Sequence, residues 1–202
     1  ILKMTITIKF YDNIKHIFNS FEEILKLDNY NGINFINCSY SKLSSLPELP
    51  NSLIELYCSY NSLSNLPELP NPLITLASSS NDLSSLPELP NSLINLICNN
   101  NNLSSLPELP NSLRILDLAT NNLSSLPELP NSLTNLDYYD NPIYNYIKLY
   151  FNNEREIYYK HHTNVKRLFA NKIGNWYLDC KYNPKYKYCR IRLMKEYEEL
   201  YN

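Results

Sequence analysis

The side chains best suited to chemistry in this chain are its thiols and imidazoles. The cysteines are Cys38, Cys58, Cys98, Cys180 and Cys189, and His161 and His162 precede the last two. The spacing of these histidines and of the last two cysteines matches no zinc signature, so no metal site is predicted. A disulfide between Cys180 and Cys189 stays an alternative, although nothing else indicates an oxidising compartment. The first three cysteines are multiples of 20 residues apart, which predicts core packing rather than reactivity.

Carboxylates are the other candidates for chemistry. Asp117, Asp137 and Asp140 could act as acid and base, but no histidine, serine or cysteine partner is expected on the same face. A second series recurs at Glu48, Glu68, Glu88, Glu108 and Glu128. This line could attract a basic partner or a cation, but a solvated face that maintains solubility explains it better. We therefore predict a non-enzymatic protein with no catalytic residues and no cofactor.

An internal repeat positions most of these residues. Leu-Pro-Glu-Leu-Pro begins at Leu46, Leu66, Leu86, Leu106 and Leu126, and this constant spacing defines a 20-residue unit. The unit reads L-x-x-L-x-C/L-x-x-N-x-L-x-x-L-P-E-L-P-N-S, and its first eleven places match the leucine-rich-repeat pattern. Five full units span residues 33–52, 53–72, 73–92, 93–112 and 113–132, and a partial sixth ends at Asn141. The sequence predicts a leucine-rich-repeat solenoid over residues 33–141.

The two halves of the unit predict two different structures. Apolar and variable residues alternate over positions one to seven, which favours short strands that pair in parallel and bury one face. Two prolines three residues apart favour an extended, polyproline II convex side. Position nine carries Asn61, Asn81, Asn101, Asn121 and Asn141. Their amides can satisfy buried backbone groups, and a stack of amides can form a structural ladder along the solenoid.

Segments of different composition flank the repeats and are expected to cap them, because each repeat buries its core only against neighbours. In residues 1–32, alternation from Thr5 to Phe10 predicts a strand. One or two helices are predicted from the spacing of Ile14, Ile17, Phe18, Phe21, Ile24 and Leu25. Ser20 and Glu23 resemble a capping box. Residues 142–202 predict a basic, Tyr-rich and mainly helical cap, with helices near 143–151, 164–173 and 190–201.

The net charge of −2 conceals a strong asymmetry. Residues 33–141 hold ten acidic groups against Lys42 and Arg114, a balance of −8, whereas residues 142–202 have a balance of +6. No stretch approaches the roughly 20 apolar residues of a membrane span, and residues 1–10 show no charged leader before an apolar run. The sequence predicts an intracellular protein that does not enter a membrane.

Recognition is expected at the outward strand positions, which vary while the rest of the unit repeats. Solenoids present such positions on a concave face, and tyrosine anchors with polar surroundings suit protein interfaces. The predicted partner-binding residues are Phe35, Asn37, Tyr40, Glu55, Tyr57, Tyr60, Ile97, Ile115, Asp117, Asp137, Tyr139 and Asp140. Aromatic residues gather at the N-terminal end of this set and carboxylates at the C-terminal end. The alternative explanation for the variation at these positions is neutral drift between duplicated units.

The unit L-P-E-L-P-N-S-L-x-x-L-x-x-x-x-N-x-L resembles the short leucine-rich repeats of secreted effectors from enteric and plague bacteria. Some of those relatives carry a ubiquitin-ligase domain with a Cys-x-Asp motif. Here Lys-Tyr follows Cys180 and Arg-Ile follows Cys189, so ligase activity does not carry over. The whole chain, with its Asn, Tyr, Ile and Lys bias, is similar to leucine-rich-repeat proteins of giant amoeba-infecting viruses of the mimivirus group. That resemblance implies engagement of host or viral proteins inside the infected cell, in the host cytoplasm.

Two functions of different kinds are therefore expected. The first is a protein-protein interaction module that binds one partner through the concave face, as a monomer or weak homodimer. The alternative places function in residues 142–202, where Trp176 and eleven tyrosines could stack on bases while Lys and Arg hold phosphates. The charges of this segment are scattered rather than clustered, so nucleic-acid binding is the weaker hypothesis. A gel shift with single-stranded RNA at low salt distinguishes the two.

Overall fold

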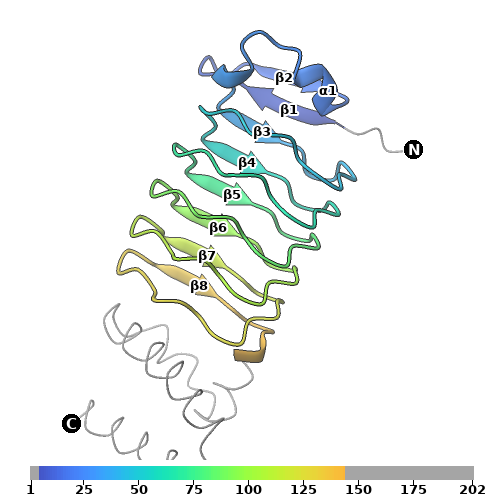
Figure 1. Ribbon diagram of the computed structural model, residues 1–202. Helices are drawn as coiled ribbons and strands as arrows, with labels where there is room; N and C mark the ends of the chain where they lie inside the picture. The colour runs from blue at the N-terminus through green and yellow to red at the C-terminus, as the bar shows by residue number, and fades with distance from the viewer. Residues whose placement is uncertain (1–4, 144–202) are drawn as a thin grey trace, which may run out of the picture.

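The repeats form one sheet that runs the length of a solenoid. The computed structural model describes residues 5–143. Figure 1 shows the strands stacked side by side, with the return segments forming a second layer of the same solenoid. The described sheet has eight strands in the order β2-β1-β3-β4-β5-β6-β7-β8. This architecture is the leucine-rich-repeat solenoid that the 20-residue unit predicts.

Each repeat contributes one three-residue strand at its positions three to five. The strands are β3 (Phe35–Asn37), β4 (Glu55–Tyr57), β5 (Thr75–Ala77), β6 (Asn95–Ile97), β7 (Ile115–Asp117) and β8 (Asn135–Asp137). They pair in parallel, and each residue lies opposite the residue 20 positions later, as Leu76 lies opposite Leu96. Successive side chains of a strand point to opposite faces. The central residue of each strand is therefore buried, and its two neighbours point to the other face.

An antiparallel hairpin extends the sheet at its N-terminal end (Figure 1). β1 (Ile6–Lys9) pairs with β2 (Lys15–Phe18) on one side and with β3 on the other, both antiparallel. Ile6 and Ile8 are fully buried. The strand expected near residues 5–10 is present, and it provides β3 with a hydrogen-bonding partner on its outer edge.

The helix predicted from Ile14, Ile17 and Phe18 is wrong, because residues 15–18 form β2. The chain reverses before this strand: Asn13 adopts a left-handed φ of 61°, and its N–H donates to Phe10 O at 3.0 Å. Pairing with β1 then overrides the helical spacing. Ile14 and Ile17 stay 57% and 68% exposed, so their apolar periodicity marks no buried helix face.

A short helix begins at the predicted capping residue. Ser20 Oγ accepts a bond from Glu23 N at 3.4 Å, and Glu23 Oε2 accepts one from Asn19 N at 3.2 Å. The helix α1 (Phe21–Ile24) buries its first and last residues. A single 3-10 turn, η1 (Tyr30–Gly32), then leads the chain into the first repeat. The N-terminal segment therefore combines a hairpin with one brief helical turn.

Columns of apolar side chains fill the space between the strands and the return segments. In the third repeat Leu73, Leu76 and Leu83 are fully buried, and equivalent leucines continue the column in the neighbouring repeats. Position six forms a column of Cys38, Cys58, Ser78, Cys98, Leu118 and Tyr138, all buried. The three cysteines are free thiols in this column, as core packing predicts. The Ser78 hydroxyl is buried among them without a hydrogen-bond partner.

The proline-containing half of each unit returns to the next strand without forming a helix or strand. It ends in a turn, in which Leu53 N donates to Pro50 O at 3.0 Å, and the same bond recurs in the later units. The serine at position twenty bonds the first residue of its own unit. Ser112 Oγ donates to Leu93 O, and Ser132 Oγ donates to Leu113 O, both at 2.6 Å. This second series of bonds was not predicted from the sequence.

The asparagine at position nine ties each repeat to the preceding one. Asn101 Nδ2 donates to Ser78 O at 3.0 Å and to Cys98 O at 3.1 Å, while its Oδ1 accepts from Leu83 N at 3.1 Å. Equivalent bonds to two repeats are formed by Asn61, Asn81, Asn121 and Asn141. In the described repeats these amides bond backbone groups and not one another. The ladder therefore consists of hydrogen bonds between side-chain amides and backbone groups.

Position eight adopts a left-handed backbone in every repeat, and no glycine occupies it. The φ angles are 58° at Tyr40, 57° at Tyr60, 55° at Ser80, 54° at Asn100, 55° at Thr120 and 56° at Asp140. The N–H of this residue donates to the next repeat, as Thr120 N does to Tyr139 O at 2.7 Å. Asparagine and aspartate tolerate this conformation, whereas a β-branched threonine is strained in it.

Thr120→Asn is expected to raise the free energy of unfolding by about 1 kcal/mol, because asparagine relieves this strain at an exposed position. Urea denaturation followed by circular dichroism measures the change. The matched control is Asn100→Thr, which introduces the strained residue at the same place in the neighbouring repeat and should lower the stability by a similar amount. Equal stability of both variants and the parent would show that position eight carries no strain.

Several expectations concern residues outside the described part of the chain. These are the predicted helices near 143–151 (beyond residue 143), 164–173 and 190–201, the basic segment as a cap or nucleic-acid binder, and the pairing of Cys180 with Cys189. Within residues 5–143, no helix has the length and apolar character needed to cross a membrane.

Candidate functional site

The outward side chains of the strands form one continuous surface, here called the strand face. It comprises positions three and five of each repeat and positions seven and eight, which follow each strand. The repeat pattern predicts that this surface is concave. The predicted residues that are half-buried there are Phe35, Asn37, Glu55, Tyr57, Ile97 and Asp117. Those that are exposed are Tyr40, Tyr60, Ile115, Asp137, Tyr139 and Asp140.

An aromatic cluster occupies the N-terminal end of the strand face. The rings of Phe35 and Tyr57 lie 5.6 Å apart, and Lys9 Nζ lies 4.5 Å from the centre of the Phe35 ring. Tyr57 donates its hydroxyl to Glu55 Oε2 at 3.0 Å. Burial, and then this bond and the Glu55 charge, raise the pKa of Tyr57. The contacts fix the orientation of two aromatic rings at the surface.

A second aromatic pair lies beside this cluster at position eight. Tyr40 and Tyr60 are stacked with ring centroids 4.3 Å apart and an angle of 8° between their planes. They nevertheless remain 69% and 51% exposed. The repeated left-handed backbone places both side chains in the same orientation, one repeat apart. Large aromatic rings held in place with a polar hydroxyl at the tip are the anchors that protein interfaces favour.

Small side chains separate the aromatic end from the rest of the face. Thr75, Ala77 and Ser79 are each only 8% exposed, although they lie on the outward side of β5 or directly after it. Ala77 is flanked in register by the larger Tyr57 on β4 and Ile97 on β6. The small residues at β5 therefore lie between an aromatic side chain on one side and an aliphatic side chain on the other.

Carboxylates occupy the C-terminal end. Asp117 on β7 and Asp137 on β8 are directly opposite in the parallel register. Asp117 Oδ1 accepts a bond from Ala119 N at 3.1 Å, and Asp137 Oδ1 accepts one from Tyr139 N at 2.9 Å. Burial raises the pKa of Asp117; the bond from Ala119 lowers it and the charge of Asp137 raises it. Neither carboxylate forms an ion pair within the described residues.

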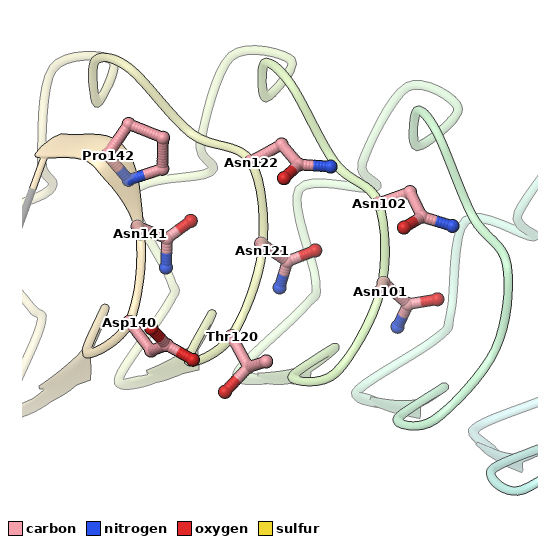
Figure 2. Close-up of a pocket in the computed structure, with 8 residues that line it drawn as sticks. All are labelled: Asn101, Asn102, Thr120, Asn121, Asn122, Asp140, Asn141 and Pro142. Carbon is pink, nitrogen blue, oxygen red and sulfur yellow. The ribbon is translucent and has the colours of Figure 1, made fainter.

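A polar hollow of about 370 Å³ lies beside the strand face, where the last three repeats turn after their strands (Figure 2). Its lining residues are Asn101, Asn102, Thr120, Asn121, Asn122, Asp140, Asn141 and Pro142. Figure 2 shows the amides of Asn101, Asn121 and Asn141 in one repeated orientation along it. These three amides already bond the backbone of two repeats each. The wall of the hollow is therefore part of the scaffold.

The thiols of the described residues are unsuited to nucleophilic chemistry. Burial raises the pKa of Cys38 to about 12, and it also raises the pKa of Cys58 and of Cys98 well above the usual range. A thiol attacks as its thiolate, which these residues do not form near neutral pH. In residues 5–143, no group of three His, Cys, Asp or Glu side chains is placed to hold a metal ion.

Two parts of this face were not predicted from the sequence. Lys9 belongs to β1, and only the antiparallel register that places it opposite Phe35 brings the two together. The small residues at β5 were visible as the run from Thr75 to Ser80, where Leu76 is the one large side chain. The absence of large outward residues in one repeat was the signal that could have identified them.

The parallel strands, leucine columns and asparagine ladder define a leucine-rich-repeat protein. No protein-family model matches the chain, and no curated protein sequence matches it either. The chain is similar to the solved leucine-rich-repeat domain of a Shigella effector, with 43% identity and a TM-score of 0.54. That similarity covers 59% of this chain and 53% of the Shigella chain.

Two solved structures of YopM, a leucine-rich effector protein, are also similar. YopM from Yersinia enterocolitica is 46% identical over 50% of this chain and 22% of its own, with a TM-score of 0.49. YopM from Yersinia pestis is 45% identical over 52% of this chain and 30% of its own, also with a TM-score of 0.49. This chain thus matches about half the length of the Shigella chain and less than a third of either YopM chain. Its repeats are of the short bacterial-effector type.

Proposed function

We propose that this protein is a non-catalytic interaction module that binds a partner protein through its strand face. The observation that carries the proposal is the placement of exposed aromatic rings and carboxylates on an otherwise uniform scaffold. Most core positions keep leucine and position nine keeps asparagine after Ser41 of the first repeat, whereas the strand face changes from repeat to repeat. Ordered tyrosines with a polar surround are typical of protein interfaces. The resemblance to effector leucine-rich repeats supports the same class of function.

The proposal is tested with a triple variant, Tyr57→Ala, Tyr60→Ser and Asp117→Asn. Each new residue already occupies the equivalent position of another repeat, at Ala77, Ser80 and Asn37, so the scaffold accepts it. We expect the tagged full chain to lose its partner in a pull-down from the native cell, while the melting temperature changes by less than about 4 °C.

The matched control is a second triple variant, Glu68→Gln, Glu88→Gln and Glu108→Gln, in the proline-containing return segments. All three glutamates are exposed, and their removal should leave partner recovery unchanged. Full recovery by the strand-face variant would contradict the proposal. Loss of recovery by the control alone would place the binding surface on the other side of the solenoid.

A further inference from the structure

The charges on the strand face are of one sign. Positions three, five, seven and eight of the six repeats hold Glu55, Asp117, Asp137 and Asp140 and no basic residue. Lys9 lies over the Phe35 ring at the N-terminal end, and it is supplied by β1 rather than by a repeat. Arg114 lies one residue before β7 and forms no ion pair with these carboxylates in the described structure. The face therefore presents a negative surface to solvent.

Folding does not require the charges of Asp117 and Asp137, because the neutral Asn37 accepts the equivalent bond from Ser39 N at 3.0 Å. Like charges directly opposite on neighbouring strands destabilise a sheet, and other repeats carry neutral residues such as Asn37 and Ala77 at this position. Each carboxylate has one oxygen bonded to a backbone N–H two residues later. This leaves its second oxygen for a partner. Positions that break a local rule of stability are expected where function requires them.

We propose that the partner presents an extended, basic segment with an arginine to the strand face. This inference rests on the proposed function and adds the chemistry of the partner. A guanidinium offers five N–H donors in a plane and binds carboxylates in a bidentate geometry. It also stacks on aromatic faces, which the exposed Tyr40 and Tyr60 pair provides. Arginine therefore matches both ends of the face, whereas an acidic segment matches neither.

The spacing of the strands sets the arrangement of the partner residues. Neighbouring strands lie about 4.8 Å apart, so β5 and β7 are separated by roughly 10 Å, which an extended chain spans in about three residues. An arginine at Asp117 and Asp137 thus places a residue about three positions away over the small side chains of β5. Tyr57 and Ile97 flank that place and favour an apolar side chain. The expected segment combines an arginine with an apolar residue at this distance.

Fluorescence anisotropy with synthetic peptides and the full chain tests this chemistry. The first peptide carries leucine and arginine about three residues apart in a serine background, and the second has glutamate in place of arginine. We expect the arginine peptide to bind and the glutamate peptide not to bind. The affinity should fall as salt is raised above about 50 mM, because the contact is electrostatic.

Two variants with the same net charge separate a docking surface from general attraction. Glu55→Gln, Asp117→Asn and Asp137→Asn remove three charges from the strand face, and Glu68→Gln, Glu88→Gln and Glu108→Gln remove three from the return segments. The first variant should bind the arginine peptide about tenfold more weakly, and the second should change the affinity less than about twofold. Equal weakening by both variants would overturn the proposal, because it would indicate attraction to the overall charge.

Other outcomes also decide the question. Failure of the arginine peptide to bind, or equal binding of the glutamate peptide, would overturn the basic-segment proposal. A doubled mass in light scattering that the Glu55→Gln, Asp117→Asn and Asp137→Asn variant abolishes would assign the strand face to a second copy of this chain. That outcome would also overturn the basic-segment proposal. The interaction module itself is judged separately, by partner recovery with the Tyr57→Ala, Tyr60→Ser and Asp117→Asn variant. A lost partner together with a peptide that does not bind would leave that function standing without this chemistry.

Discussion

Replacing Asn101 by alanine is expected to lower the free energy of unfolding by about 3 to 5 kcal/mol, because buried backbone groups lose their partners. The amide donates to Ser78 O and Cys98 O and accepts from Leu83 N, and it is only 7% exposed. Each buried polar group left unpaired costs about 1 to 3 kcal/mol. Because stability in a solenoid depends on contact between neighbours, a break in a central repeat weakens both halves. Chemical denaturation of the full chain measures the loss.

The adjacent Asn102 provides a matched control. It has the same side chain, lies one residue away and is exposed, so Asn102→Ala should change the stability by less than about 0.5 kcal/mol. Asn101→Asp separates donor loss from the loss of volume. It keeps the shape and an acceptor for Leu83 N, but near neutral pH it places a carboxylate against the carbonyls of Ser78 and Cys98. We expect it to be at least as destabilising as alanine. A loss below about 1 kcal/mol for both variants would mean that water replaces the ladder bonds.

The stability of the protein is expected to fall steeply as the pH rises from 9 to 12. The usual pKa of 9.0 applies to the thiol in the unfolded chain, and burial raises the pKa of Cys38 to about 12. Between these values the unfolded state releases its proton while the folded state keeps it, so rising pH favours unfolding. The stability is fully present below pH 9, and each further pH unit removes up to about 1.4 kcal/mol per thiol. The direction is the same for Cys58 and Cys98.

A cysteine-to-serine series isolates this contribution from other groups that titrate in the same range, such as Tyr30, whose pKa is raised to about 12 by burial and by the Glu48 charge. Ser78 already occupies the same buried column, so Cys58→Ser and Cys98→Ser are compatible with the scaffold. The double variant should start from a lower stability at pH 8 but lose less of it by pH 10.5. A parallel decline in both proteins would exclude Cys58 and Cys98 as the cause.

The repeat allowed the solenoid to be predicted from the sequence because one geometric solution satisfies every copy. A leucine that recurs every 20 residues must meet its own equivalent, so the parallel register between Leu56, Leu76 and Leu96 follows from the period. The same reasoning placed the asparagines where strands turn. It did not predict whether their amides bond one another or the backbone, because a side chain with both donors and acceptors satisfies either arrangement.

The N-terminal segment shows where this reasoning stops. Ile14, Ile17 and Phe18 fit helical spacing, but spacing alone contains no information about the free edge of β1, which β2 covers. Non-local pairing decided the structure there, and one copy of a segment offers no period from which to read a register. The contact between Lys9 and Phe35 was missed for the same reason. The stacking of Tyr40 on Tyr60 depends on the left-handed backbone at position eight. Glycine is the usual sequence signal for that conformation, and none occurs at this position.

The side-chain bonds between repeats join residues separated by 18 to 23 positions, and each of them connects adjacent units. Removal of residues 93–112 would therefore bring Asn121 to Leu83 N and Ser78 O, the backbone groups that Asn101 bonds now. The number of repeats can thus change while the contacts between neighbouring units stay the same. Whole units can be gained or lost between near-identical Leu-Pro-Glu-Leu-Pro segments without a new kind of contact. Such changes would lengthen or shorten the available surface in steps of one strand, while the two ends stay as they are.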